Sequence, residues 1–170
     1  HLRNASVVQT QNARLGITLR DTYPQHKIGR LAPILSDLRM LKEPEELQAL
    51  QVACDITEKG FKRVLNFTKP GVTEYEIEAE FIHEFTRNRS EGFAYTPIIA
   101  SGANACVLHY IDNALPCTDG DMLLLDVGAS YANYNADMTR TIPVNGRFNP
   151  RQKQVYQAVH SVLDFATKIM

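Results

Sequence analysis

The stretch Leu123–Thr141, which reads LLLDVGASYANYNADMTRT, decides how this chain folds. It begins with a short apolar run and ends with alternating apolar and polar residues, so it predicts the two strands of a β-hairpin. With the turn centred between Tyr131 and Ala132, Asp126 and Asp137 lie directly opposite each other. Two such carboxylates, about 5 Å apart at Cβ, repel each other and destabilise a sheet. The sequence therefore predicts either a cation that neutralises the pair or one carboxyl group that stays protonated.

The composition is that of an ordinary globular chain. Its 170 residues are 44% hydrophobic and 22% charged, with a net charge of −1, which suits one domain with a core and part of a second. Near-neutral charge, the lack of an apolar run of about 20 residues and the lack of a signal-peptide layout argue against nucleic acid and membrane partners. Cys54, Cys106 and Cys117 lack CxxC spacing, which favours reduced thiols and a cytoplasmic location.

Two helices are predicted before the hairpin. Pro44 is tolerated in a first helical turn, and the KPG at 69–71 ends this helix. Its predicted apolar stripe consists of Leu47, Leu50, Cys54, Phe61 and Leu65. Thr73 and Glu76 form a capping box that opens the second helix. The predicted apolar face of that second helix consists of Ile77, Phe81 and Phe85.

The remaining elements complete an α+β layout. GITL at 16–19 is compatible with a short strand, and RLAPILSDLR at 30–39 with a terminal helix or a connector. FAYTPIIASG at 93–102 predicts a strand, and Asn149 followed by Pro150 predicts the start of a last helix. Helices followed by strands and another helix indicate a largely antiparallel sheet with covering helices.

Two places on the chain could carry chemistry. The aspartate pair is compatible with a structural, hydrogen-bonded pair or with a metal site. Carboxylate oxygens without thiolates suit manganese, magnesium or calcium, and also zinc or cobalt when histidine is added. His109 lies in an irregular stretch, where it is either a loop histidine bonded to backbone or a functional group held by a scaffold. No Ser/His/Asp or Cys/His arrangement, nucleophile elbow or phosphate-binding glycine loop is indicated.

Three segments together resemble the pita-bread metallopeptidase family, and within it aminopeptidase P. DVGASYANYNADMTRTIPVNGRF at 126–148 is similar to its first metal-ligand segment, D-x-G, then Y-x-x-D-x-T-R-T, then a turn glycine. SGANACVLHYIDN at 101–113 is similar to the segment before it, and LRMLKEPEEL at 38–47 to the start of the catalytic domain. The resemblance covers residues 38–170 as the first half of that domain, and residues 1–37 resemble the end of an amino-terminal domain.

The resemblance implies hydrolysis of the amino-terminal Xaa-Pro bond of peptides with two divalent metal ions, of manganese type, with cobalt or zinc as alternatives. Asp126 would chelate one ion, Asp137 would bridge both, and His109 would contact the substrate. A proline-containing peptide is the implied substrate, and a homo-oligomer is the implied state of a full-length member.

The resemblance also implies that part of the site is missing. The family completes its metal site with a histidine and two glutamates from the second half of the fold, and no matching pattern follows Asp137. The chain is therefore expected to be an internal fragment that is inactive alone, because each divalent ion wants about six oxygen ligands. Two alternatives remain: an Xaa-Pro dipeptidase (prolidase), and a non-catalytic binding module with the same fold.

Overall fold

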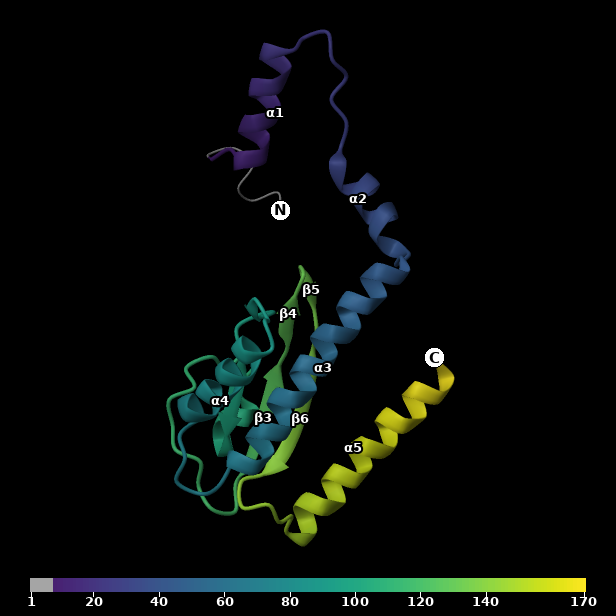
Figure 1. Ribbon diagram of the computed structural model, residues 1–170. Helices are drawn as coiled ribbons and strands as arrows, with labels where there is room; N and C mark the ends of the chain where they lie inside the picture. The colour runs from purple at the N-terminus through teal and green to yellow at the C-terminus, as the bar shows by residue number, and fades with distance from the viewer. Residues whose placement is uncertain (1–7) are drawn as a thin grey trace. The chain divides into compact units, whose positions relative to one another are not determined.

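The computed structural model describes residues 8–170, which divide into two compact units, one ending at Lys42 and one spanning Glu43–Met170 (Figure 1). In the first unit, α1 spans Gln11–Thr22 and α2 spans Leu31–Met40, and neither helix buries a residue. Helix α2 confirms the helix expected there. The strand expected at 16–19 is wrong, because the Thr10 side chain caps a helix that runs through it. The assignment of residues 1–37 to another domain stays a prediction.

The second unit begins with the two helices that the sequence predicts. Helix α3 spans Pro44–Phe67, with Pro44 in its first turn and Glu43 and Glu46 in a capping box. Helix α4 spans Glu74–Arg87, and its capping box of Thr73 and Glu76 is also formed. The predicted apolar face of α4 is confirmed, because its three members Ile77, Phe81 and Phe85 are all buried.

The stripe predicted for α3 is confirmed at Phe61 and holds in part at the half-buried Leu50, but it is wrong at its other three positions. The residues that α3 buries are Ala53, Ile56, Thr57, Gly60, Phe61 and Val64, whereas Leu47 and Leu65 are about half exposed. The reason lies at Gly60, where an added Cβ would come within 2.9 Å of the rings of Phe81 and Phe85. The two helices approach where α3 has no side chain, so the fit to α4 selects the buried face.

The strands form two antiparallel sheets. One sheet has the order β1-β4-β5, made of Gly92–Phe93, Ala129–Tyr131 and Tyr134–Asn135. The other has the order β2-β3-β6, made of Ile98–Ser101, Met122–Val127 and Met138–Pro143. A short 3-10 helix, η1, spans Gly102–Cys106, and α5 spans Pro150–Ile169 with its expected cap at Asn149. The α+β class with antiparallel sheets is confirmed, although the predicted hairpin is divided between both sheets.

The turn of that hairpin falls one residue later than predicted. Ala132 and Asn133 both have positive φ, of 50° and 63°, which is typical of the two-residue turns that connect twisted strands. As a result Asp126 pairs with Thr139, and the prediction that it directly faces Asp137 is wrong. A shift of one residue in the turn centre moves the register by two, so Asp137 lies diagonal to Asp126 instead of opposite it.

Gly128 lets the two arms of this hairpin come close together. A Cβ built there would overlap the carbonyl oxygen of Ala136, a backbone atom that cannot move aside. On the next residue, the Ala129 N–H donates to the buried Thr57 hydroxyl of α3 at 2.9 Å. A hydrogen bond from the hairpin main chain to a side chain of α3 therefore joins hairpin and helix at the point where β3 passes into β4.

The core lies between α3, α4 and one face of the sheet β2-β3-β6 (Figure 1). Along β3, Leu123, Leu125 and Val127 are fully buried, and the residues between them are half-buried. Alternate residues of a strand point to opposite faces, so Asp126 points away from the core helices. Asp126 therefore lies on the face of the sheet opposite to the core.

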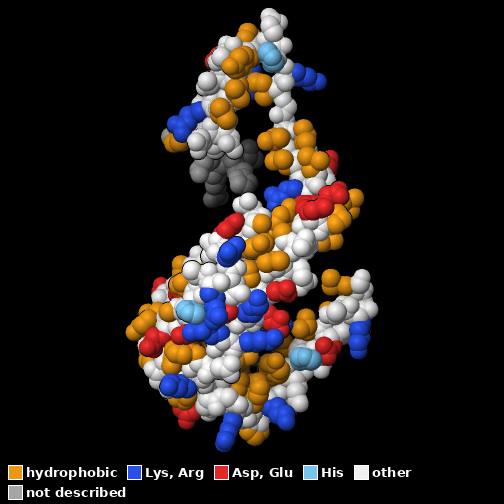
Figure 2. All heavy atoms as spheres, viewed as in Figure 1, with side chains coloured by type: hydrophobic (Ala, Val, Ile, Leu, Met, Phe, Trp, Pro, Cys, Tyr) orange, Lys and Arg blue, Asp and Glu red, His pale blue; other side chains and the backbone are white. Residues whose placement is uncertain are grey.

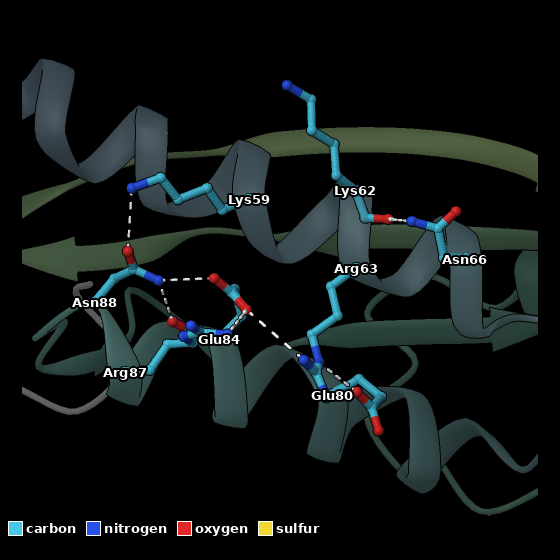
Figure 3. A network of polar contacts seen from close by, with 8 residues as sticks. All are labelled: Lys59, Lys62, Arg63, Asn66, Glu80, Glu84, Arg87 and Asn88. Carbon is cyan, nitrogen blue, oxygen red and sulfur yellow. Dashed lines mark hydrogen bonds and ion pairs between the residues drawn. The ribbon is translucent and has the colours of Figure 1, made fainter.

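Outside this core, charged side chains join α3 to α4 (Figure 3). Arg63 donates to Glu80 and lies 3.9 Å from a Glu84 oxygen, and Arg87 lies 3.8 Å from the same oxygen. Lys59 donates to the Asn88 side chain at 3.1 Å. The contacts of Arg63 and Lys59 cross from α3 to α4 at the rim of the core, whereas the Arg87–Glu84 pair lies within α4.

Candidate active site

Three side chains from separate segments meet on the outer face of the sheet. Asp126 comes from the central strand β3, Asp137 immediately precedes β6, and Tyr95 precedes β2. The Tyr95 hydroxyl lies 2.7 Å from Asp126 Oδ1 and 3.0 Å from Asp137 Oδ1. The structure thus brings the two aspartates together through a shared hydrogen-bonding partner, although their register differs from the predicted one.

This cluster holds more acceptors than donors. The Tyr95 hydroxyl has a single proton, so the two carboxylate oxygens must share it. Burial, together with the hydrogen bonds to Asp126 and Asp137, raises the pKa of Tyr95 above its usual range, and the phenol stays protonated. Among residues 8–170, neither aspartate takes part in a salt bridge. The local charge is therefore negative and favours a cation.

His109 faces the same space as the aspartates. A cavity of about 380 Å³ is lined by Tyr95, Thr96, Ile98, His109, Ile111, Asp126 and Asp137. All three residues singled out from the sequence line this one cavity. His109 is exposed and has a φ of 54°, a conformation that non-glycine residues rarely adopt. Such a backbone is often found where a side chain has to be presented in a set direction.

Tyr95 is the residue that sequence reasoning missed. It belongs to the FAYTPIIASG segment, which predicts a strand but contains no spacing that distinguishes one tyrosine from another. Its place follows from the pairing of Ile98 with Asp126, which sets the chain before β2 beside the carboxylate. Only that non-local pairing identifies Tyr95 as part of the site.

The donor set fits a divalent cation that prefers oxygen, but only in part. Asp126 and Asp137 could supply carboxylate oxygens, the ligand type that manganese and magnesium favour. Within residues 8–170, no group of three or more His, Cys, Asp or Glu residues is placed to hold a metal ion. The two aspartates are thus the residues that would hold a cation, with further ligands needed to complete its coordination.

Similarity to known proteins identifies the family of this chain. The chain matches the model of metallopeptidase family M24 over residues 48–170, and it belongs to that family. An Xaa-Pro aminopeptidase of Haemophilus influenzae is 43% identical over 127 residues, which cover 75% of this chain and 30% of that protein. The chain therefore spans about 30% of the length of this curated relative.

Solved structures show the same fold. Proline aminopeptidase P II from Yersinia pestis is similar with a TM-score of 0.82 and 34% identity, over 93% of this chain and 39% of that one. Zinc-substituted Escherichia coli aminopeptidase P, in complex with product, is similar with a TM-score of 0.84 and 32% identity, over 97% of this chain and 39% of that one. The predicted pita-bread fold is confirmed.

No helix in the part of the chain that the structure describes is long and apolar enough to span a membrane.

Proposed function

We propose that this chain carries part of the active site of an Xaa-Pro aminopeptidase, which hydrolyses the bond between an amino-terminal residue and a following proline. The observation that carries the proposal is the meeting of Asp126 and Asp137 on one tyrosine hydroxyl, in a cavity that His109 also lines. Membership of a metallopeptidase family and the names of the similar proteins support it.

Each residue has a proposed role. Asp126 and Asp137 hold divalent cations, which when bound polarise a carbonyl group and supply a nucleophile at neutral pH. Tyr95 fixes the orientation of both carboxylates through its hydroxyl. His109 lines the same cavity, where it can donate a hydrogen bond to the charge that develops on the substrate carbonyl oxygen.

For the cation we propose two ions of manganese type, because the aspartates supply only oxygen donors. The zinc named in the E. coli structure shows that a related protein also accepts another divalent ion. Two carboxylates leave most of the coordination of two such ions to other ligands. We therefore expect residues 1–170 by themselves to bind Mn²⁺ weakly and to hydrolyse no peptide.

The test is a calorimetric titration of Mn²⁺ into the chain and into Asp126→Asn. We expect the variant to lose most of the binding heat, because an amide is a neutral and weaker ligand than a carboxylate. Asp119→Asn is the matched control, since Asp119 lies in a surface turn, where its Oδ1 accepts from Asn145 and an amide oxygen can accept in its place. The control should titrate like the unmodified chain.

Peptide assays accompany the titration. An Xaa-Pro-Xaa tripeptide and an Xaa-Pro dipeptide are incubated with the chain and Mn²⁺. Mn²⁺ binding that is unchanged in Asp126→Asn, or the absence of binding to the unmodified chain, would overturn the proposed metal site. Cleavage by the chain alone would contradict the expected inactivity, and a preference for the dipeptide would favour the prolidase alternative.

A further inference from the structure

A buried carboxylate lies behind the loop that carries His109. Glu74, in the first turn of α4, is 0% exposed. Its Oε1 accepts from the Ser101 N–H at 2.8 Å and from the Asn104 side chain at 3.1 Å. Its Oε2 accepts from the Tyr110 hydroxyl at 2.7 Å and from the Leu115 N–H at 3.0 Å. A buried charge is costly unless several donors satisfy it, and here both oxygens are satisfied.

These bonds tie together two points that are distant along the chain. Ser101 ends β2 and Leu115 lies after the irregular stretch, so the two oxygens of one side chain hold both ends of the segment 101–115. The Glu74 backbone N–H also donates to the Leu115 carbonyl at 3.0 Å. Closing a loop costs chain entropy, and this carboxylate supplies bonds that offset it at the point of closure.

Apolar burial does little to hold this segment. Its large apolar side chains face outward, with Val107 54%, Leu108 85% and Ile111 55% exposed. Residues with polar groups are buried in their place, namely Ser101 at 6%, Tyr110 at 8% and Asn113 at 4% exposed. The segment 101–115 is therefore held mainly by directional hydrogen bonds, which set an orientation as well as a distance.

Asn113 provides a second attachment point. Its side chain accepts from the Ile99 N–H at 3.1 Å and donates to the Pro97 carbonyl at 3.2 Å, which fastens the segment to the start of β2. Its amide also donates to Glu78 on α4 at 3.0 Å. Glu74 and Glu78, both on α4, therefore contact the segment 101–115.

His109 lies between these attachment points and next to Tyr110. Its positive φ is unfavourable for a residue with a side chain, so the surrounding contacts have to hold it. The bond from the Tyr110 hydroxyl to Glu74 fixes the adjacent residue and with it the direction in which His109 leaves the backbone.

We propose that Glu74 is a positioning residue that orients His109 over the Asp126/Asp137 cavity by clamping both ends of the segment 101–115. Its meaning for catalysis rests on the proposed function. The clamp, meaning the hydrogen bonds from Glu74 to Ser101 and Leu115, sets how the chain presents His109, and it can be tested without peptide hydrolysis.

Glu74→Gln tests the clamp with almost no change in size. A glutamine has one oxygen, so its NH₂ group must face either Ser101 N–H or Leu115 N–H, two backbone donors that cannot both be satisfied. The Tyr110 hydroxyl and the Asn104 amide can reorient, whereas a backbone N–H cannot. The substitution therefore leaves one end of the segment unpaired.

The readouts are NMR measurements on the isotopically labelled chain. We expect amide exchange at Ser101 or Leu115 to speed up by roughly 10- to 100-fold relative to amides in α3. The ring signals of His109 should move towards those of a histidine in an unfolded peptide. Unchanged exchange at both ends, or unchanged His109 signals, would overturn the proposal.

Ile77→Ala is the matched control for lost stability. Ile77 is one turn along α4, fully buried in the core and outside the clamp. We expect it to destabilise the unit while leaving the His109 ring signals unchanged. Equal movement of those signals in Ile77→Ala would show a general loosening instead of a clamp, and would also overturn the proposal.

Tyr110→Phe is the milder variant if Glu74→Gln does not fold. It removes one donor to Oε2 and the oxygen that accepts from the Ala114 N–H at 3.5 Å, but the N–H groups at both ends of the segment keep their bonds to Glu74. We expect the His109 ring signals to shift in the same direction by a smaller amount, and their constancy would count against the clamp.

A Mn²⁺ titration separates this inference from the proposed function. Because the aspartates belong to β3 and the segment before β6, Mn²⁺ affinity in Glu74→Gln should stay within about twofold of the unmodified chain. A chain that binds no Mn²⁺ would overturn the proposed metal site but leave the exchange and ring measurements to decide the clamp. A large loss of Mn²⁺ affinity in Glu74→Gln would show that Glu74 also supports the aspartates, and would contradict the proposal that it acts on His109 alone.

Discussion

Helices α3 and α5 have the same local signals and very different surroundings. Each is long, of 24 and 20 residues, and each begins with a capping box and a proline in its first turn. Helix α3 buries six of its residues, beside α4 and the sheet, whereas α5 buries none. Caps and proline decide where a helix begins, but they do not decide what it packs against.

The apolar side of α5 stays open to solvent. Together with Met122 and the Thr139–Thr141 part of β6 it borders a groove of about 600 Å³. Its exposed apolar residues include Val155, Val159, Val162, Leu163, Phe165 and Ile169. Figure 2 shows hydrophobic side chains, in orange, at this surface. The difference teaches that an amphipathic pattern predicts a face suited to burial, while burial itself needs a partner surface.

The largest effect is expected where the packed region is tightest. Gly128→Ala should lower the free energy of unfolding by at least about 3 kcal/mol, because the new Cβ overlaps the Ala136 carbonyl oxygen. Urea unfolding followed by circular dichroism measures the change. Gly16→Ala in α1 is the control, since no atom lies within 4 Å of its Cβ position and the helix should gain slightly. A point mutation typically lowers the free energy of unfolding by about 1 kcal/mol. A loss for Gly128→Ala below about that value would mean that the hairpin arms can separate to make room for the Cβ.

A pair of identical substitutions compares the two helices directly. Val64→Ala on α3 removes a fully buried side chain and should cost about 2 kcal/mol. Val159→Ala on α5, at a position 64% exposed, should cost nothing and slightly favour the helix. Thermal and urea unfolding of both variants provide the test. Equal losses would show that α5 contributes to the same cooperative core, and would break the comparison.

The cap of α5 should matter more than its packing. Asn149→Ala removes the side-chain oxygen that accepts from the Gln152 N–H at 2.8 Å, at an expected cost of about 1 kcal/mol to the helix. Amide exchange should increase in α5 and stay constant in α3. Asn149→Ser, which keeps a capping oxygen, should restore protection, and a variant whose α3 amides also exchange faster would link the two helices.

The smallest effect is expected at the rim of the packed region. Arg63→Met removes the contacts from α3 to Glu80 and Glu84 and should cost about 0.5–1 kcal/mol, with less effect in high salt. Lys62→Met, which breaks only an exposed pair with Glu58, should cost about 0.3 kcal/mol. Unfolding at low and high sodium chloride measures both. If the two variants lose the same stability at every salt concentration, the connection between helices contributes nothing beyond a surface pair.

Much of the candidate site could be predicted because its residues come from short motifs. Asp126, Asp137 and His109 each belong to a segment that resembles the family, and the structure places all three at one cavity. Tyr95 and Glu74 could not be found in this way, because their roles depend on partners 31 to 42 and 27 to 41 positions away in sequence. Local patterns contain no information on such pairings.

The sequence by itself determined the starts of α3, α4 and α5, the apolar face of α4, the antiparallel α+β class and the family. These features depend on interactions within a few residues, or on motifs that are read directly. The tertiary structure alone decided the face that α3 buries, the register of Asp126 and the hydroxyl that joins the two aspartates. The buried face of α3 is set by the fit of Gly60 to two phenylalanine rings of α4. The register is set by the turn Ala132–Asn133, and the place of the hydroxyl by the pairing of Ile98 with Asp126. Each depends on the fit of one segment against another, which local sequence patterns do not contain.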